Sequence, residues 1–122
     1  MLIESLKPPR VFPVGISAIE LQHCANISLS DDEVVTFLRE SGSEYDFASK
    51  SWGFYVTPSI NGRLAEFGFR TAIIVNSLNN KIFILAVESG SEKEFFEYLD
   101  RECLRVWKWV DEMFDEILSE PE

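Results

Sequence analysis

Two short β-branched runs and one long apolar stripe dominate the second half of the chain. Thr71–Val75 and Ile82–Val87 have the composition of strands, and Asn79-Asn80 between them suits a tight turn. Between Ser91 and Leu118, apolar residues recur in alternating steps of three and four, which places them on one face of a helix. This stripe consists of Phe96, Leu99, Cys103, Val106, Val110, Met113 and Ile117. The pattern predicts a β-hairpin followed by one long helix that packs on the sheet.

The apolar arc of the predicted helix is wider than one sheet contact needs. It extends over roughly half of the circumference, against the ~100° that is usual for a helix on a sheet. The residues that widen it are Phe95, Leu104, Trp107, Phe114 and Leu118. Either a concave sheet wraps the helix, or a second contact exists, most simply a homodimer through the helix shoulder near Leu104 and Trp107. Ser91 and Glu94 have the spacing of a capping box at the helix start.

The first thirty residues predict one strand and one extended segment. Met1–Gly15 contains three prolines, which lack a backbone donor, so it is an edge strand or an extended arm. Ile19–Leu29 alternates between apolar and polar residues and predicts a half-buried strand. The single histidine, His23, falls on its apolar face, where we expect a hydrogen-bonded core residue rather than a ligand or general base.

The segment Asp31–Glu40 is compatible with two structures. Ser30–Glu33 resembles a capping box, and Gly42 suits the position after a helix. Val34–Phe37 is strand-prone, however, and the serines around Gly42 suit a hairpin loop leading into Tyr45. We favour the strand.

The segment Tyr45–Val56 is expected to be a long strand with a fault. Its apolar residues change parity at Ser49–Ser51, which indicates a bulge or a strand break. Ile60–Leu64 is either a tight turn or one helical turn, capped by Asn61 and stopped at Gly68.

These elements predict a single α+β domain over residues 1–122. Its core is a curled, mainly antiparallel sheet of about five or six strands, with one long C-terminal helix packed on it. Residues 1–15 form the arm or edge strand, residues 16–90 the sheet and residues 91–119 the helix.

The charge of the chain disfavours nucleic acid as a partner. The net charge is −10, and residues 92–122 hold eleven acidic against four basic residues, so no basic stripe can displace counterions. No apolar run approaches the ~18 to 20 residues of a membrane span, and Met1–Arg10 has no apolar core of a secretory signal. Cys24 and Cys103 are isolated, which is typical of free thiols in a reducing compartment. We therefore expect a cytoplasmic protein without membrane contact.

The familiar catalytic patterns are missing from the sequence. It has no P-loop, GxGxxG or GxSxG motif, and one histidine with two cysteines cannot complete a structural zinc site. Cys24 follows His23 directly, so on a strand their side chains point to opposite faces. We predict no metal and no cofactor, assign no catalytic residue, and regard an enzyme as unsupported.

One stretch, Tyr45–Arg70, combines aromatic and polar side chains in an otherwise acidic chain. Arg63 and Arg70 are able to hold a phosphate or carboxylate as planar forks while an aromatic ring stacks on a sugar or base. The alternative is that both arginines pair with nearby Asp46 and Glu66. The candidate ligand-binding residues are Tyr45, Asp46, Trp52, Tyr55, Asn61, Arg63 and Arg70.

The same stretch carries a family resemblance. The run Trp52–Leu64, with Glu44–Asp46 before it and Phe67–Arg70 after it, resembles a set of small uncharacterised bacterial proteins that are often encoded among genes for surface-polysaccharide or sugar biosynthesis. The resemblance extends from Leu6 to about Trp109. It implies a bacterial, cytoplasmic setting and sugar-related work, and it transfers no catalytic residue.

Three function hypotheses follow. The first is a non-catalytic binding or accessory module that recognises a sugar-phosphate, a similar anionic ligand or a partner enzyme through Tyr45–Arg70. The second is an acidic inhibitor of the immunity or antitoxin type that covers a basic effector. The third is a small barrel-type enzyme that uses Asp46, Tyr55 or His23 with an arginine.

Overall fold

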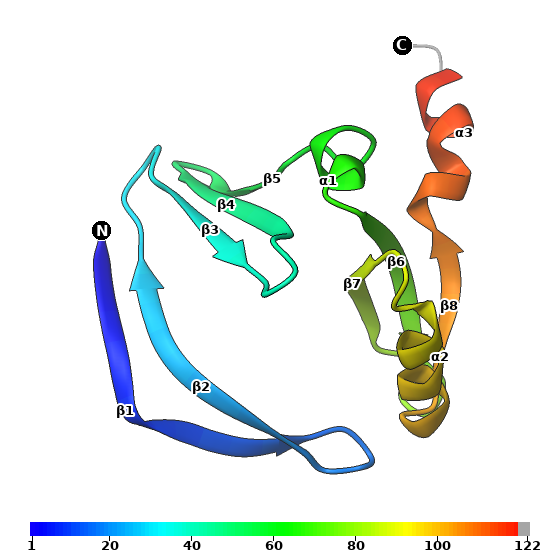
Figure 1. Cartoon of the computed structure of the whole chain (residues 1–122), viewed down its shortest axis with the longest axis horizontal. Helices are drawn as coiled ribbons and strands as arrows, with labels where there is room; N and C mark the ends of the chain where they lie inside the picture. Colours follow the sequence, from blue (N-terminus) through cyan, green and yellow to red (C-terminus); the bar gives the residue numbers. More distant parts are fainter. Residues whose placement is uncertain (120–122) are drawn as a thin grey trace.

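The computed structural model describes residues 1–119, which form three small antiparallel sheets (Figure 1). The first is the hairpin of β1 (Leu2–Val14) and β2 (Ile19–Ser28). The middle sheet consists of β3 (Val34–Leu38), β4 (Glu44–Lys50) and β5 (Gly53–Thr57). The C-terminal sheet has the order β7-β6-β8, with β6 at Phe69–Asn76, β7 at Ile82–Glu88 and β8 at Leu104–Trp109. The helical segments are α1 (Arg63–Glu66), α2 (Glu92–Arg101), the 3-10 helix η1 (Val110–Met113) and α3 (Phe114–Ser119).

The predicted α+β fold with a single curled sheet and a long C-terminal helix is wrong. The described chain is mostly β, with eight strands in three sheets, and its longest helix has 10 residues. The expected helix over residues 91–118 ends at Arg101, because Cys103 takes a left-handed conformation with φ +56°. The chain then re-enters the C-terminal sheet as β8, which pairs with β6. Leu104 and Trp107 therefore lie on a strand, and the helix shoulder that they were expected to form does not exist.

A β-bulge explains why β8 was mistaken for a helix. The register between β6 and β8 shifts so that Trp109 lies opposite Ala72 and Val106 lies opposite Ile74. The extra residue places Val106 and Trp109, three positions apart, on the same face of a strand. A spacing of three is also the spacing of a helix, so the apolar pattern did not distinguish between the two structures.

The core lies between α2 and one face of the C-terminal sheet. Its buried members are Ala72, Ile74, Val87, Leu99 and Trp109. The β6–β7 hairpin that contributes three of them is confirmed, with its turn at the expected asparagines. The capping box at the start of α2 is wrong, because the Ser91 side chain caps no amide there. Instead the Glu92 carboxylate accepts a hydrogen bond from the Gly90 amide.

The N-terminal hairpin is an extended arm. Figure 1 shows it curving below the middle sheet, with its turn near α2. At that turn the Ser17 amide donates a hydrogen bond of 3.2 Å to the buried Glu102 carboxylate. Gly15, at φ +74°, leaves the space that this carboxylate occupies, because a Cβ there would collide with Glu102 Oε1. Glu102 thus fastens the arm to the C-terminal sheet.

The middle sheet confirms the strand that we favoured within Asp31–Glu40. The contact between Ser30 and Glu33 is formed, with 2.8 Å from the Ser30 amide to Glu33 Oε1, but it lies in the turn before β3 instead of capping a helix. The fault in Tyr45–Val56 is a hairpin turn at Ser51-Trp52, since Lys50 pairs with Gly53. Across a two-residue hairpin turn, odd-numbered residues of one strand pair with even-numbered residues of the next. Odd-numbered residues of β4 and even-numbered residues of β5 therefore share one face.

Candidate functional site

The middle sheet presents a continuous apolar face, which we call the aromatic face. The pairing of Val35 with Phe47, Phe37 with Tyr45, and Phe47 with Val56 places these side chains on one side of the sheet. The face consists of Val35, Phe37, Tyr45, Phe47, Phe54 and Val56. The ring centroids of Phe37 and Phe47, and of Tyr45 and Phe47, are both 5.6 Å apart, which is contact distance for aromatic rings.

This aromatic face is open. Phe54 is 61% exposed and Phe37 is also exposed, whereas Tyr45 and Phe47 at the centre are half-buried. Partial burial of the Tyr45 ring raises the pKa of its phenol, so this hydroxyl is neutral at physiological pH. An exposed, uncharged aromatic patch of this kind is suited to stacking on another apolar surface.

The opposite face of the middle sheet carries a carboxylate, Asp46, whose two oxygens both accept hydrogen bonds. Asp46 is buried, and its Oδ1 accepts a hydrogen bond of 2.7 Å from the Thr36 hydroxyl. Its Oδ2 lies 3.3 Å from Nη2 of Arg63, a residue at the start of α1. Both carboxylate oxygens therefore have partners, and this arrangement holds α1 against the sheet.

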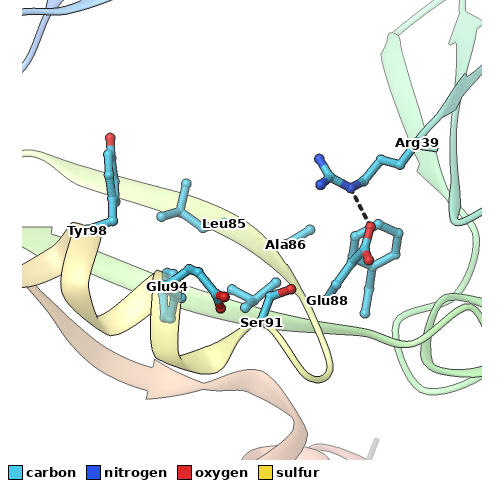
Figure 2. Close-up of a pocket in the computed structure, with 10 residues that line it drawn as sticks. Arg39, Leu85, Ala86, Glu88, Ser91, Glu94 and Tyr98 are labelled. Carbon is cyan, nitrogen blue, oxygen red and sulfur yellow. Dashed lines mark ion pairs between the residues drawn. The ribbon is translucent and has the colours of Figure 1, made fainter. Parts of the chain in front are cut away.

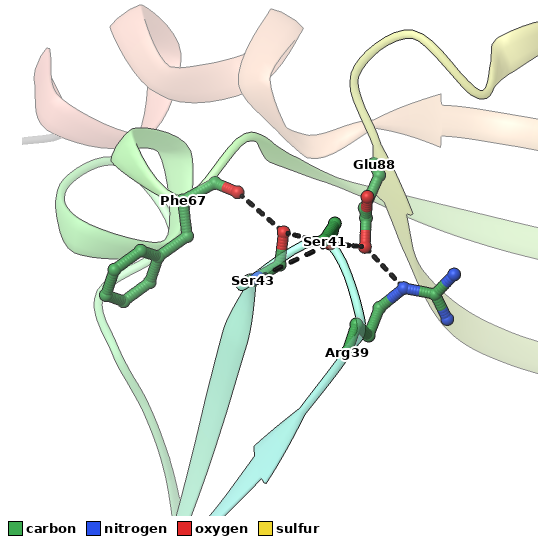
Figure 3. Close-up of polar contacts among 5 residues, drawn as sticks. All are labelled: Arg39, Ser41, Ser43, Phe67 and Glu88. Carbon is green, nitrogen blue, oxygen red and sulfur yellow. Dashed lines mark hydrogen bonds and ion pairs between the residues drawn. The ribbon is translucent and has the colours of Figure 1, made fainter.

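A polar network joins the middle sheet to the C-terminal sheet (Figure 3). The buried Ser43 hydroxyl donates a hydrogen bond of 3.1 Å to the Phe67 carbonyl. Ser41 donates to Glu88 at 3.0 Å, and Arg39 forms an ion pair with the same carboxylate. The loop between β3 and β4 is thus tied to the end of α1 and to the end of β7, which sets the position of the aromatic face.

Two cavities flank β7, and neither is lined by the predicted ligand-binding residues. The first, of about 350 Å³, lies between β7, α2 and Arg39 (Figure 2). Its walls include Leu85, Phe95 and Tyr98, and Arg39 pairs with Glu88 at the end of the cavity away from Tyr98. The second, of about 460 Å³, lies between the turn of the arm and the C-terminal sheet. Both are lined mainly by apolar surface.

The structure divides the seven predicted ligand-binding residues among several surfaces. Tyr45 belongs to the aromatic face, whereas Asp46 and Tyr55 are on the opposite face. Trp52 is exposed in the turn between β4 and β5, and Asn61 is exposed in the loop before α1, which it does not cap.

The two arginines engage different carboxylates. Arg63 pairs with Asp46, which is one of the two carboxylates that the alternative interpretation named. Within the described part of the chain, neither Arg63 nor Arg70 forms an ion pair with the other one, Glu66. Arg70 donates two hydrogen bonds to Asp111, of 2.9 and 3.2 Å, and its guanidinium lies 3.9 Å from the centre of the Trp109 ring. The Asp111 contact raises the pKa of Arg70, so this guanidinium is charged at all ordinary pH values. An anionic ligand of either arginine would compete with, or share the guanidinium with, a carboxylate that is already bound to it.

His23 is hydrogen-bonded, as expected, but it lies on the arm and not in a core. Its Nε2 is 3.1 Å from the Ala25 carbonyl, and Arg10 Nε donates to its Nδ1 at 3.4 Å. Within residues 1–119, no three His, Cys, Asp or Glu side chains are grouped closely enough to hold a metal ion. No helix in the same range is long and apolar enough to cross a membrane.

Comparison of the chain with protein-family models, with curated protein sequences and with solved structures found no significant match in any of the three. The aromatic face is consequently defined by geometry alone. Sequence reasoning missed Phe37, Phe54 and Val56 as members of one surface. The signal was present in the change of parity within Tyr45–Val56, which marks a hairpin if Ser51-Trp52 is taken as its turn.

Proposed function

We propose that this protein is a non-catalytic binding module that recognises a partner protein through the aromatic face. The observation that carries the proposal is the exposure of a contiguous aromatic patch on one face of the three-stranded middle sheet. Aromatic residues are enriched at protein interfaces, and truncating a few of them removes most of the binding energy. Large exposed apolar patches on folded proteins mark interaction sites.

The proposal prefers a protein to a small anionic ligand as the partner. Arg63 and Arg70 are already paired with Asp46 and Asp111, and they lie on different elements, α1 and β6. Displacing a carboxylate from a formed pair offsets much of what an incoming phosphate gains. The apolar face has no such competitor, and covering it removes aromatic area from water directly.

On the family resemblance alone, we further propose that the partner is an enzyme of bacterial surface-sugar metabolism. We place this interaction in the cytoplasm, because the two isolated cysteines are both exposed and unpaired, as in a reducing compartment. The acidic-inhibitor hypothesis remains a prediction that requires the carboxylates of α2 and α3, and not the aromatic face, to contact the partner.

Two adjacent residues of β5 provide a matched test. Phe54 is 61% exposed on the aromatic face, and Tyr55 is 54% exposed on the opposite face. A photo-crosslinking phenylalanine analogue is placed at either position in cells of the native host, and the crosslinked proteins are identified by mass spectrometry. We expect one distinct protein to be captured from position 54 and not from position 55. Equal capture from both positions, or capture only of a second copy of this chain at position 54, contradicts the proposal.

A second variant pair checks that the face binds and is not merely near the partner. Phe54→Ser is expected to abolish copurification of the captured protein, while Tyr55→Ser leaves it intact. Both substitutions are at exposed positions and should leave the fold unchanged. Retention of the captured protein by Phe54→Ser overturns the proposal.

A further inference from the structure

The C-terminal sheet has a second apolar surface, on the side opposite α2, which we call the open face. Its members pair across β6 and β7: Thr71 with Ala86, Ile73 with Ile84, and Val75 with Ile82. Alternate residues of the same strands, including Ala72, Ile74 and Val87, point to the core. Ile82 and Ile84 are 69% and 71% exposed, so nothing in residues 1–119 covers this part of the sheet.

A solvated sheet face does not have this composition. Antiparallel sheets with one wet side alternate between apolar residues inside and polar residues outside. The six residues of the open face include one threonine, no charge and four β-branched aliphatic side chains. This composition resembles the inner face of a β-sandwich, where a second sheet packs about 10 Å away.

The total surface of the chain also indicates a missing contact. The structure exposes 8948 Å², whereas a compact monomer of 14.0 kDa exposes about 6,700 Å², so roughly 2,200 Å² per chain is in excess. The open face, the aromatic face and the arm share this excess, so the ~4,500 Å² that two copies would bury by covering all of it is an upper limit for the open-face contact; obligate homodimers bury about 2,000 Å² or more. The extended arm accounts for part of this excess, since a two-stranded hairpin is marginal in water without a covering layer.

We propose that the open face packs against the open face of a second copy of this chain, in a two-fold sandwich with α2 on each outer side. A two-fold contact brings the same patch of both copies together, so the patch must not repel itself. The six residues of the open face meet this condition because they are uncharged. The charged residues on the same side of the sheet, Glu88 of β7 and Arg105 and Lys108 of β8, border them and include both signs. The purely aliphatic centre of the open face is typical of permanent assemblies, whereas the aromatic face has the composition of a partner site.

The oligomeric state of the purified full-length chain tests this proposal. Sedimentation equilibrium is measured for the wild type, for Ile84→Lys on the open face and for Leu78→Lys in the turn between β6 and β7. Leu78 is a matched control because it is 69% exposed and lies outside the open face. We expect the wild type and Leu78→Lys to be dimers at micromolar concentration and Ile84→Lys to be a monomer with an unchanged circular dichroism spectrum. A monomeric wild type, or a dimeric Ile84→Lys, overturns the proposal.

A milder substitution keeps the test decisive if the lysine variant does not fold. Ile84→Ala removes buried aliphatic area from both copies and is expected to raise the dimer dissociation constant at least ~10-fold. A dimer dissociation constant of Ile84→Ala within about twofold of the wild-type value contradicts the proposal that the open face forms the dimer contact. This result is independent of the aromatic face, because crosslinking from Phe54 reports on a different sheet.

Discussion

The rings of Tyr45 and Phe69 lie with their centroids 6.1 Å apart and thereby connect the middle sheet to the C-terminal sheet. Tyr45 is on the aromatic face, and Phe69, paired with Glu88, has the same parity along β6 as the open face. The two apolar surfaces therefore meet at this ring pair. The polar network from Ser41 and Ser43 lies beside it, so the angle between the sheets is fixed by one apolar and one polar contact.

The Ser43 hydroxyl is expected to stabilise this junction measurably. Ser43 is buried, so Ser43→Ala leaves the Phe67 carbonyl without its donor at a site with little access to water and should lower the free energy of unfolding by about 1 to 2 kcal/mol. Urea denaturation followed by circular dichroism measures the change. Ser51→Ala, in the exposed turn between β4 and β5, is the control and should change the free energy by less than about 0.5 kcal/mol. Equal effects of the two substitutions would show that the junction does not form.

The two contacts of Asp46 are expected to differ in strength. Thr36→Val removes the hydrogen bond of 2.7 Å and should destabilise the fold by about 1 to 2 kcal/mol, because the acceptor is a buried charge. Arg63→Gln removes an ion pair whose cation is exposed to water, so its effect should be below about 1 kcal/mol. Both values come from urea denaturation at low ionic strength. A larger loss for Arg63→Gln than for Thr36→Val contradicts the assignment of Thr36 as the main partner.

The attachment of the arm should depend on pH through Glu102. The Ser17 hydroxyl lowers the pKa of this carboxyl below its ordinary value of 4.5, and the backbone amides of Ser17 and Ile16 add to the effect. Because the folded-state pKa is the lower one, the stabilisation is complete above the unfolded pKa and is lost as the pH falls through the folded pKa. We expect the hydrogen-exchange protection factor of the Ser17 amide to be high at neutral pH and to fall below pH 4.5.

The variant Glu102→Gln provides the control for this pH dependence. Its neutral amide cannot titrate, so the protection factor of the Ser17 amide should be low and the same at both pH values. A wild-type arm whose protection is identical at neutral and acidic pH would show that Glu102 does not hold it.

Local signals predicted the β6–β7 hairpin and the strand within Asp31–Glu40, because β-branched runs and turn residues act over a few positions. The complete order in which strands pair in the middle and C-terminal sheets could not be predicted in the same way. The aromatic face depends on which strands pair, and that pairing is set by a turn at Ser51-Trp52 that has no strong turn signature. The seven candidate site residues share aromatic or polar side chains, but chemical type does not determine position. The structure separates Arg63 from Arg70 because they belong to different elements.

The end of α2 illustrates a different limit. Cys103 has φ +56°, a conformation usually left to glycine or asparagine, so nothing in its residue type indicated that the helix stops there. Tertiary pairing overrode the local pattern: the free edge of β6 accepted Leu104–Trp109 as a strand. The extra residue of the bulge then gave Val106 and Trp109 a spacing of three, which is also a helical spacing.

The two tryptophans Trp109 and Trp52 distinguish the β8 strand from the expected helix. Trp109 is 9% exposed, packs at 5.6 Å from Phe95 between ring centroids, and supports the Arg70 guanidinium. Trp109→Ala should therefore cost about 3 to 5 kcal/mol in the free energy of unfolding. Trp52→Ala, at a position that is 69% exposed, should cost less than about 0.5 kcal/mol. On a continuous helix over residues 91–118, Trp109 lies beyond the edge of the apolar stripe, and its truncation would be nearly neutral. Urea denaturation of both variants thus decides between the two structures from a single pair of measurements.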